Sequence, residues 1–173
     1  MLETTGPVHA LVLLSCGTPP QIGALQAAAA PPLAQALDLQ LAHALPTAPG
    51  PQAHSALAAL TAGTLVPVPQ DPGRTTADGG HWAELLGAWR QPCLLLISAE
   101  QLDSGVAAAT TALLQQWQVP LLGLVQWQGS WDQQARLADQ LPWLGCLGGR
   151  EAQPAAVALA AARRGLQLQA QLQ

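Results

Sequence analysis

The stretch CLLLISAEQLDSGVAAATTALLQQWQVPLLGLVQ, residues 93–126, contains the repeating unit that decides the fold. It begins with the uninterrupted apolar run 93–98, has helical spacing of apolar residues over 104–117, and ends with a second apolar run at 121–126. Such runs are typical of strands that are buried on both faces, and strands that alternate with helices are typical of a parallel sheet. The stretch therefore predicts a strand, a helix and a second strand, with Ser104 as a plausible N-cap of the helix.

The rest of the chain repeats this alternation. Further strands are expected at 8–15, 64–68 and 143–147, and further helices at 81–89, 131–141 and 154–164. We expect one α/β domain over residues 1–173, built as a three-layer sandwich. Its sheet should be mostly parallel, with five strands or slightly more, and helices should cover both faces.

Three segments depart from the alternation. Residues 31–45 predict a helix that starts at Pro31-Pro32. Residues 46–52, PTAPGPQ, carry three prolines and a glycine and predict a surface loop. The tail 166–173, LQLQAQLQ, alternates strictly, which is typical of an edge strand, although a terminal Gln-rich segment is equally typical of a frayed end.

Composition argues against several classes of function. The formal net charge is -4, every basic residue is an arginine, and no arginine cluster exceeds a pair, so a nucleic-acid partner is not expected. No apolar run approaches the ~20 residues of a membrane span, so we expect no membrane partner and a cytoplasmic protein. Cys16, Cys93 and Cys146 are widely separated and lie in or beside apolar runs, so neither a disulfide nor a metal site is expected.

The segment LLSCGTPPQIGAL, residues 13–25, has the outline of a phosphate-binding loop between a strand and a helix. The positions that match this outline are Cys16, Gly17, Thr18, Ile22 and Gly23. Ala24 and Leu25 stand where such a loop carries the lysine that neutralises phosphate and the Ser/Thr that binds magnesium. Pro19 and Pro20 remove two N–H donors. We expect residues 16–23 to turn tightly into a helix that begins near Ile22 or Gly23.

Together with later segments, this loop resembles dethiobiotin synthetase, a family of P-loop NTPase-like fold. The family's first loop typically reads CGTDTGVGKT. Residues 59–68, ALTAGTLVPV, are similar to its EGAGGxxVPL stretch, and residues 141–147, LPWLGCL, are similar to its xPLLGxLP stretch. The resemblance spans about residues 8–148. It implies a homodimeric ligase of biotin biosynthesis that uses ATP and magnesium to close a cyclic urea.

The chain departs from the family's pattern at the positions that carry chemistry. In addition to Ala24 and Leu25, Leu60 stands at the family's acidic position, and the asparagine that reads adenine falls near Gln126 or Trp127. The phosphate, metal and base elements are therefore altered together. The resemblance thus points to a degenerate Walker A loop.

A second candidate site is the polar segment 69–81, PQDPGRTTADGGH, which follows the expected strand 64–68. Ligands of α/β proteins gather beyond the carboxyl ends of the strands. The candidate ligand-binding residues are Asp71, Arg74, Asp78, His81, Glu100 and Asp103. The alternative is a solvated turn at Asp78-Gly79, with Asp103 and Ser104 as capping residues. No pair of residues has metal-ligand spacing.

Three functions stay open at this point. The first is a non-catalytic dethiobiotin synthetase-like pseudoenzyme that serves as a binding or scaffold domain, with no cofactor, as a homodimer or with another protein partner. The second is a divergent ATP- and magnesium-dependent synthetase, and the third is an unrelated α/β ligand-binding domain. The altered loop favours the first, and Trp127 and Trp131 would mark a contact surface if they are exposed.

Overall fold

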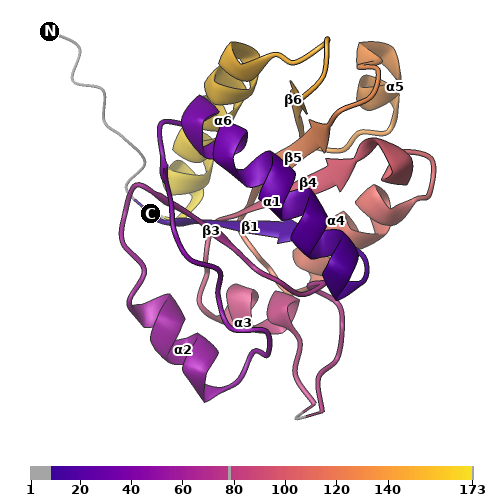
Figure 1. The fold of residues 1–173 in the computed structure, drawn as a ribbon. Coiled ribbons are helices and arrows are strands. Elements are labelled where there is room, and N and C mark those ends of the chain that lie inside the picture. The colour runs from indigo at the N-terminus through magenta and orange to yellow at the C-terminus, as the bar shows by residue number, and fades with distance from the viewer. Residues whose placement is uncertain (1–8, 78, 173) are drawn as a thin grey trace, which may run out of the picture.

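The computed structural model describes residues 9–77 and 79–172 and contains a six-stranded sheet whose paired strands are all parallel (Figure 1). The strands are β1 (Leu11–Ser15), β2 (Gln40–Leu41), β3 (Thr64–Pro67), β4 (Cys93–Ser98), β5 (Leu121–Trp127) and β6 (Trp143–Leu147). Their order is β2-β3-β1-β4-β5-β6. The predicted α/β sandwich is confirmed, with six strands instead of five. Residue 8 of the expected first strand lies outside the described residues.

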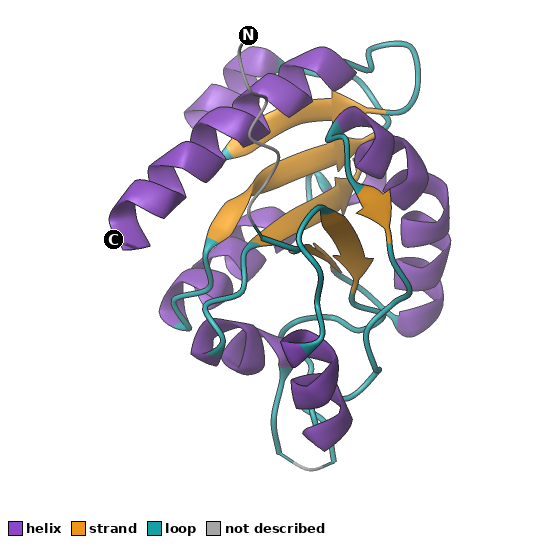
Figure 2. Ribbon diagram, turned by 90° about the vertical axis from the view of Figure 1, so that its left-hand side faces the viewer, coloured by secondary structure: helices purple, strands orange, loops and turns teal. Residues whose placement is uncertain are grey.

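Helices cover both faces of the sheet (Figure 2). They are α1 (Pro19–Ala36), α2 (Pro51–Ala58), α3 (Trp82–Ala88), α4 (Val106–Gln116), α5 (Gln133–Ala138) and α6 (Pro154–Leu172), with a short 3₁₀ helix, η1 (Ala99–Gln101). α1 and α6 pack on one face, while α2, α3 and α4 pack on the other. Right-handed crossovers explain this division, because the chain leaves β1 toward one edge of the sheet and later moves toward the other edge.

The central strand β4 shows why its sequence does not alternate. Leu94 and Leu96 pack toward α1 and α6, whereas Leu95 and Ile97 pack toward α2, α3 and α4. All four side chains are fully buried. Both faces of the strand thus need apolar residues, as expected for a parallel sheet between two helical layers. None of the helices in the described part of the chain combines the length and hydropathy needed to cross a membrane.

The expected helix over 31–45 is wrong at both ends. α1 starts at Pro19, runs through Pro31 and Pro32, and ends at Ala36. The two prolines cost helical hydrogen bonds, but neighbouring residues such as Ala30 and Leu33 are buried against the sheet and stabilise the helix there. Gln40 and Leu41 then form β2, an edge strand that pairs with β3.

The two other irregular segments also differ from expectation. The Pro-rich loop expected at 46–52 ends at Gly50, because Pro51 starts α2, and proline is favoured in the first turn of a helix. The tail expected as an edge strand or a frayed end is helical through Leu172, as the last turns of α6. Its leucines alternate, but Leu168 also lies on the helical face that carries Val157 and Ala161 into the core.

Candidate functional site

The carboxyl edge of the sheet opens where the chain changes direction. β1 lies between β3 and β4, and the helix that follows β1 packs on the opposite face from the helices that follow its two neighbours. In α/β sheets this is the position where ligands usually bind. Three loops meet there: residues 16–18 after β1, residues 68–81 after β3, and residues 99–105 after β4. We refer to this region as the carboxyl-edge crevice.

Gly17 and Asp71 are joined directly across the carboxyl-edge crevice. The Gly17 N–H donates to Asp71 Oδ2 at 2.9 Å, and the Gly73 N–H donates to Asp71 Oδ1 at 2.9 Å. Gly17 has φ +124°, and a Cβ at this position would lie 2.9 Å from Gln21 Oε1. Glycine is therefore favoured here by its backbone conformation, and an added Cβ would also displace the end of the Gln21 side chain.

Thr18 closes the loop at the start of α1. Its N–H and its hydroxyl both lie 2.9 Å from Gln21 Oε1, which accepts from them. The loop between β1 and α1 thus has only three residues, 16–18, because Pro19 already belongs to the helix. The expected helix start near Ile22 or Gly23 is wrong, since prolines prefer the first turn of a helix and place that turn earlier.

This early start removes two residues from the predicted phosphate loop. Ile22 is fully buried within α1, and Gly23 lies on the exposed side of the helix. A Cβ at Gly23 would meet no atom within 4 Å. The resemblance implied that both residues belong to a flexible loop. In the structure both lie in α1, so neither contributes a loop amide.

Cys16 is held inside the carboxyl-edge crevice. Its Sγ lies 3.1 Å from Thr110 Oγ1, and its carbonyl accepts from Gln101 Nε2 at 2.9 Å. Burial raises the pKa of the Cys16 thiol to about 12, while the Thr110 hydrogen bond lowers it and the Asp71 charge raises it. Burial also raises the pKa of Cys93 and of Cys146. Because the thiolate is the nucleophilic form, these buried thiols are poor nucleophiles at neutral pH.

The other predicted site residues are not drawn into this network. Arg74, Glu100 and Asp103 are exposed, and within the described residues their side chains form no hydrogen bond or salt bridge. His81 is the N-cap of α3, where its Nδ1 accepts from the Glu84 N–H at 3.2 Å. Asp78 lies outside the described residues. The N-cap of α4 is Gly105, so neither Asp103 nor Ser104 takes that position.

Four polar residues that the sequence analysis did not single out complete the carboxyl-edge crevice. They are Gln21, Gln26, Gln101 and Thr110. Gln26 is buried in α1, and its Nε2 donates to the Val68 carbonyl at 2.9 Å and to Ser15 Oγ at 3.3 Å. Position 26 falls four residues after the buried Ile22 and four before the buried Ala30. A glutamine on this otherwise apolar helical face was therefore the feature of the sequence that could have indicated a buried polar contact.

Gln126, one of the two positions near which the resemblance places the adenine-reading asparagine, bonds to its own loop. Gln126 is fully buried, and its Nε2 donates to the carbonyls of Gln128 and Ser130 at 2.8 and 3.0 Å. Its Oε1 is buried with no partner in the described residues. Trp127 is half-buried against the core, and Trp131 packs edge-on against Trp143 with ring centroids 6.2 Å apart. Trp127, at the end of β5, and Trp131, in the loop that follows, are therefore both partly buried.

The carboxyl-edge crevice offers the Asp71 carboxylate, the hydroxyls of Thr18 and Thr110, and side-chain amides. Within residues 9–77 and 79–172, no group of three His, Cys, Asp or Glu side chains is arranged to hold a metal ion. Comparison with known proteins adds no family: no family model matches the chain, and no curated protein matches it either. The likeness to dethiobiotin synthetase rests on the motifs described above.

Proposed function

We propose that this protein is a non-catalytic, dethiobiotin synthetase-like domain that works by binding or as a scaffold. The observation that carries the proposal is the hydrogen bond from the Gly17 N–H to the Asp71 carboxylate. In a working phosphate site, the amides of this loop point at the phosphates. Here the Asp71 carboxylate already accepts the hydrogen bond from the Gly17 N–H that a phosphate would need.

Other features of the loop support the same reading. The Thr18 N–H is taken by Gln21, and Pro19 and Pro20 have no N–H to offer. The chain contains no lysine, and position 24, where the resemblance places the phosphate-binding lysine, is an exposed alanine. Electrostatic stabilisation is usually the largest contribution to phosphoryl transfer, so a loop without a cation and with an adjacent carboxylate is poorly suited to ATP chemistry.

The second candidate, a divergent ATP-dependent synthetase of biotin biosynthesis, is favoured by one observation. The Thr18 hydroxyl follows β1 and Asp71 follows the neighbouring β3, and a hydroxyl and a carboxylate after adjacent strands are the residue types that hold magnesium in P-loop NTPases. This alternative would need ATP and magnesium. It would also need Asp71 to release Gly17.

Calorimetric titration of the full chain with ATP and magnesium separates the two candidates. We expect no affinity in the micromolar range, with ADP and magnesium-free ATP as controls. The double variant Ala24→Lys/Leu25→Thr should not gain affinity, because both positions lie in α1 beyond its first turn and Asp71 still occupies the loop. Magnesium-dependent micromolar binding by the unaltered chain would contradict the proposal and favour the synthetase.

For the partner, we propose a second copy of the chain that docks along α6. Leu159 and Leu166 are 54% and 69% exposed and lie one heptad apart on this helix. Ala155 and Ala162, also exposed, fall on the same uncharged stripe, so large and small residues alternate and two antiparallel copies would interdigitate. Light scattering should show a dimer for the unaltered chain and a monomer for Leu159→Gln/Leu166→Gln. A dimer that survives both changes would exclude this stripe.

A further inference from the structure

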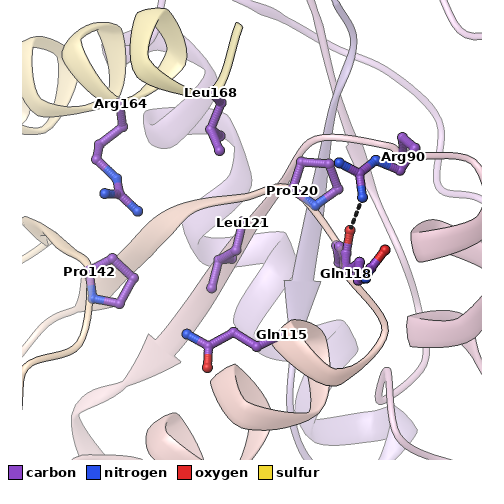
Figure 3. Close-up of a pocket in the computed structure, with 9 residues that line it drawn as sticks. Arg90, Gln115, Gln118, Pro120, Leu121, Pro142, Arg164 and Leu168 are labelled. Carbon is purple, nitrogen blue, oxygen red and sulfur yellow. Dashed lines mark hydrogen bonds between the residues drawn. The ribbon is translucent and has the colours of Figure 1, made fainter. Parts of the chain in front are cut away.

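A pocket of about 320 Å³ lies at the amino edge of the sheet, at the opposite end from the carboxyl-edge crevice (Figure 3). We refer to it as the amino-edge pocket. Residues just before and at the start of β5 and just before β6 form part of its wall, Arg90 after α3 forms another part, and α4 and α6 supply the rest. Leu121 and Leu168 are among its apolar lining residues, and Arg90, Arg164, Gln115 and Gln118 are its polar ones. None of the lining residues, all of which belong to the described part of the chain, is acidic.

Each of the two arginines is anchored through one N–H. Arg90 Nη1 donates to the Gln118 carbonyl at 3.3 Å, and Arg164 Nε donates to the Leu122 carbonyl at 3.3 Å. A guanidinium has five N–H donors. The remaining donors of both residues have no hydrogen-bond or salt-bridge partner within residues 9–77 and 79–172. Figure 3 shows Arg164 reaching from α6 toward Pro142 and Leu121, with Gln115 extending from α4 into the same space.

A purely structural role explains only one of these arginines. Arg90 follows α3 and contacts the carbonyl of Gln118, just beyond α4, and helix C-termini favour cations. Arg164 lies within α6, well before its last turn, and its side chain is half-buried. The Arg164 Nη1 and Nη2 groups, which have no partner among the described residues, are not buried, so they are open to solvent and accessible to an anionic ligand.

We propose that the amino-edge pocket binds a small organic carboxylate with an apolar body. The carboxylate would pair with Arg164, because the guanidinium fork matches a carboxylate in two parallel hydrogen bonds, while Arg90 lines another part of the pocket and adds positive charge. The apolar body would pack on Leu121 and Leu168. The volume lies at the lower end of the range of small-molecule sites, which fits a ligand of one ring or a short chain. This site is independent of the function proposed for the carboxyl edge.

The test is an NMR titration of the ¹⁵N-labelled full chain with benzoate. We expect saturable shifts of the Val119, Leu121 and Leu168 amides at roughly millimolar ligand. Benzamide has the same shape without the charge and should bind at least about tenfold more weakly. Arg164→Gln should weaken benzoate binding by at least about tenfold, whereas Arg163→Gln, which changes an exposed neighbour outside the pocket, should leave it unchanged.

Several results would overturn the proposal. These are the absence of saturable shifts, equal binding of benzamide and benzoate, and shifts confined to Gly17 and Thr18 at the other edge. Inorganic phosphate that binds as well as benzoate would also contradict it, because the apolar body would then contribute nothing. If Arg164→Gln does not fold, Gln115→Trp provides a second test, since it changes an exposed residue and should fill the pocket and abolish benzoate binding.

Discussion

At the carboxyl edge of the sheet, the amides of Gly17 and Thr18 donate to Asp71 and Gln21, whereas at the amino edge Arg90 and Arg164 keep most of their donors unpaired among the described residues. The first edge is where α/β proteins usually bind ligands. In this molecule, the side chains of Asp71 and Gln21 bind the amides that a ligand would otherwise use at that edge. The pocket with unused donors lies at the other end.

This difference shows that the topology of the sheet determines where a crevice forms, but does not by itself make that crevice a binding site. An anionic ligand must replace the acceptors that already bond to the N–H donors of the crevice. The Asp71 carboxylate, which accepts from the Gly17 N–H, is a strong competitor for such a ligand. The amino-edge pocket has no such competitor among its lining residues, because none is acidic. Substitutions at either edge test this difference.

The largest effect is expected where α3 meets the backbone that leads into the amino-edge pocket. A Cβ at Gly87 would lie 1.9 Å from the Trp117 carbonyl oxygen, one residue before Gln118. Backbone atoms cannot yield as a flexible side chain can, so Gly87→Ala should lower the free energy of unfolding by about 3 kcal/mol or more. Urea denaturation followed by circular dichroism measures this loss.

Gly165→Ala serves as the control for Gly87→Ala. Gly165 is also helical, but its added Cβ would lie 3.8 Å from Leu122 Cδ1, which is an ordinary contact. This variant should be as stable as the unaltered chain or slightly more stable. Equal losses in the two variants would mean that α3 and the end of α4 are not packed as described.

Alkaline pH compares the two edges through their thiols, since Cys16 directly follows β1 at the carboxyl edge and Cys93 starts β4 at the amino edge. The chain has no lysine and no tyrosine, so cysteines are the side chains that titrate between about pH 8 and pH 11. An unfolded thiol ionises near its ordinary pKa of 9.0, whereas burial raises the pKa of native Cys16 to about 12. Between about pH 9 and pH 12, the Cys16 thiol is therefore ionised in the unfolded state and protonated in the native state.

The free energy of unfolding should therefore fall as pH rises above about 9, by up to about 1.4 kcal/mol per pH unit for each such thiol. Below about pH 9, the thiols are protonated in both states and this loss of stability does not occur. Cys16→Ser and Cys93→Ala should each remove one thiol's share of the slope, as measured by urea denaturation at several pH values. A slope that neither variant changes would show that these thiols ionise equally easily in both states.

Asp71→Ala should have a smaller effect, because the amides of Gly17 and Gly73 that it leaves unpaired are partly open to water. We expect a loss of about 1–2 kcal/mol in the free energy of unfolding. Asp71→Asn keeps one acceptor oxygen and should lose less than Asp71→Ala. If neither substitution changes stability, the hydrogen bond to Gly17 does not close the carboxyl-edge crevice, and the comparison between the two edges fails.

These sites also show how far sequence reasoning reaches. The expected strands at 64–68, 93–98, 121–126 and 143–147 are confirmed as β3 to β6, because burial on both faces leaves an apolar run that can be read directly. β2 has only two residues with exposed side chains, so its backbone pairing leaves no such signal.

The polar residues divide in the same way. The positions of Cys16, Gly17, Thr18 and Asp71 beyond the ends of strands were predictable from the apolar runs, and the structure joins two of these residues, Gly17 and Asp71, by a hydrogen bond. Gln21 was missed although its spacing from Thr18 is that of a Thr-x-x-Gln capping box, which is a local signal. Gln101 could not be singled out, because glutamine is frequent throughout the chain and Gln101 contacts the carbonyl of Cys16, which is distant in the chain.

The smallest effect is expected at Gly23, where the interpretation of the carboxyl edge can be tested most directly. In the phosphate-loop outline this glycine supplies a flexible turn, and alanine there would be unfavourable. In the structure it lies in the second turn of α1, is exposed, and has no atom within 4 Å of an added Cβ. Alanine restricts the unfolded chain and favours the helix, so Gly23→Ala should raise the free energy of unfolding by about 0.5–1 kcal/mol.

Gly17→Ala is the matched control for Gly23→Ala, since it alters the glycine that does have a positive φ and a close neighbour at 2.9 Å. That variant should be destabilised, and urea denaturation of the two variants side by side gives opposite signs if α1 begins at Pro19. A loss of stability in both variants would indicate that residues 16–23 form one continuous loop. The carboxyl edge would then have the backbone of a phosphate site after all, and the contrast with the amino edge would rest on Asp71 alone.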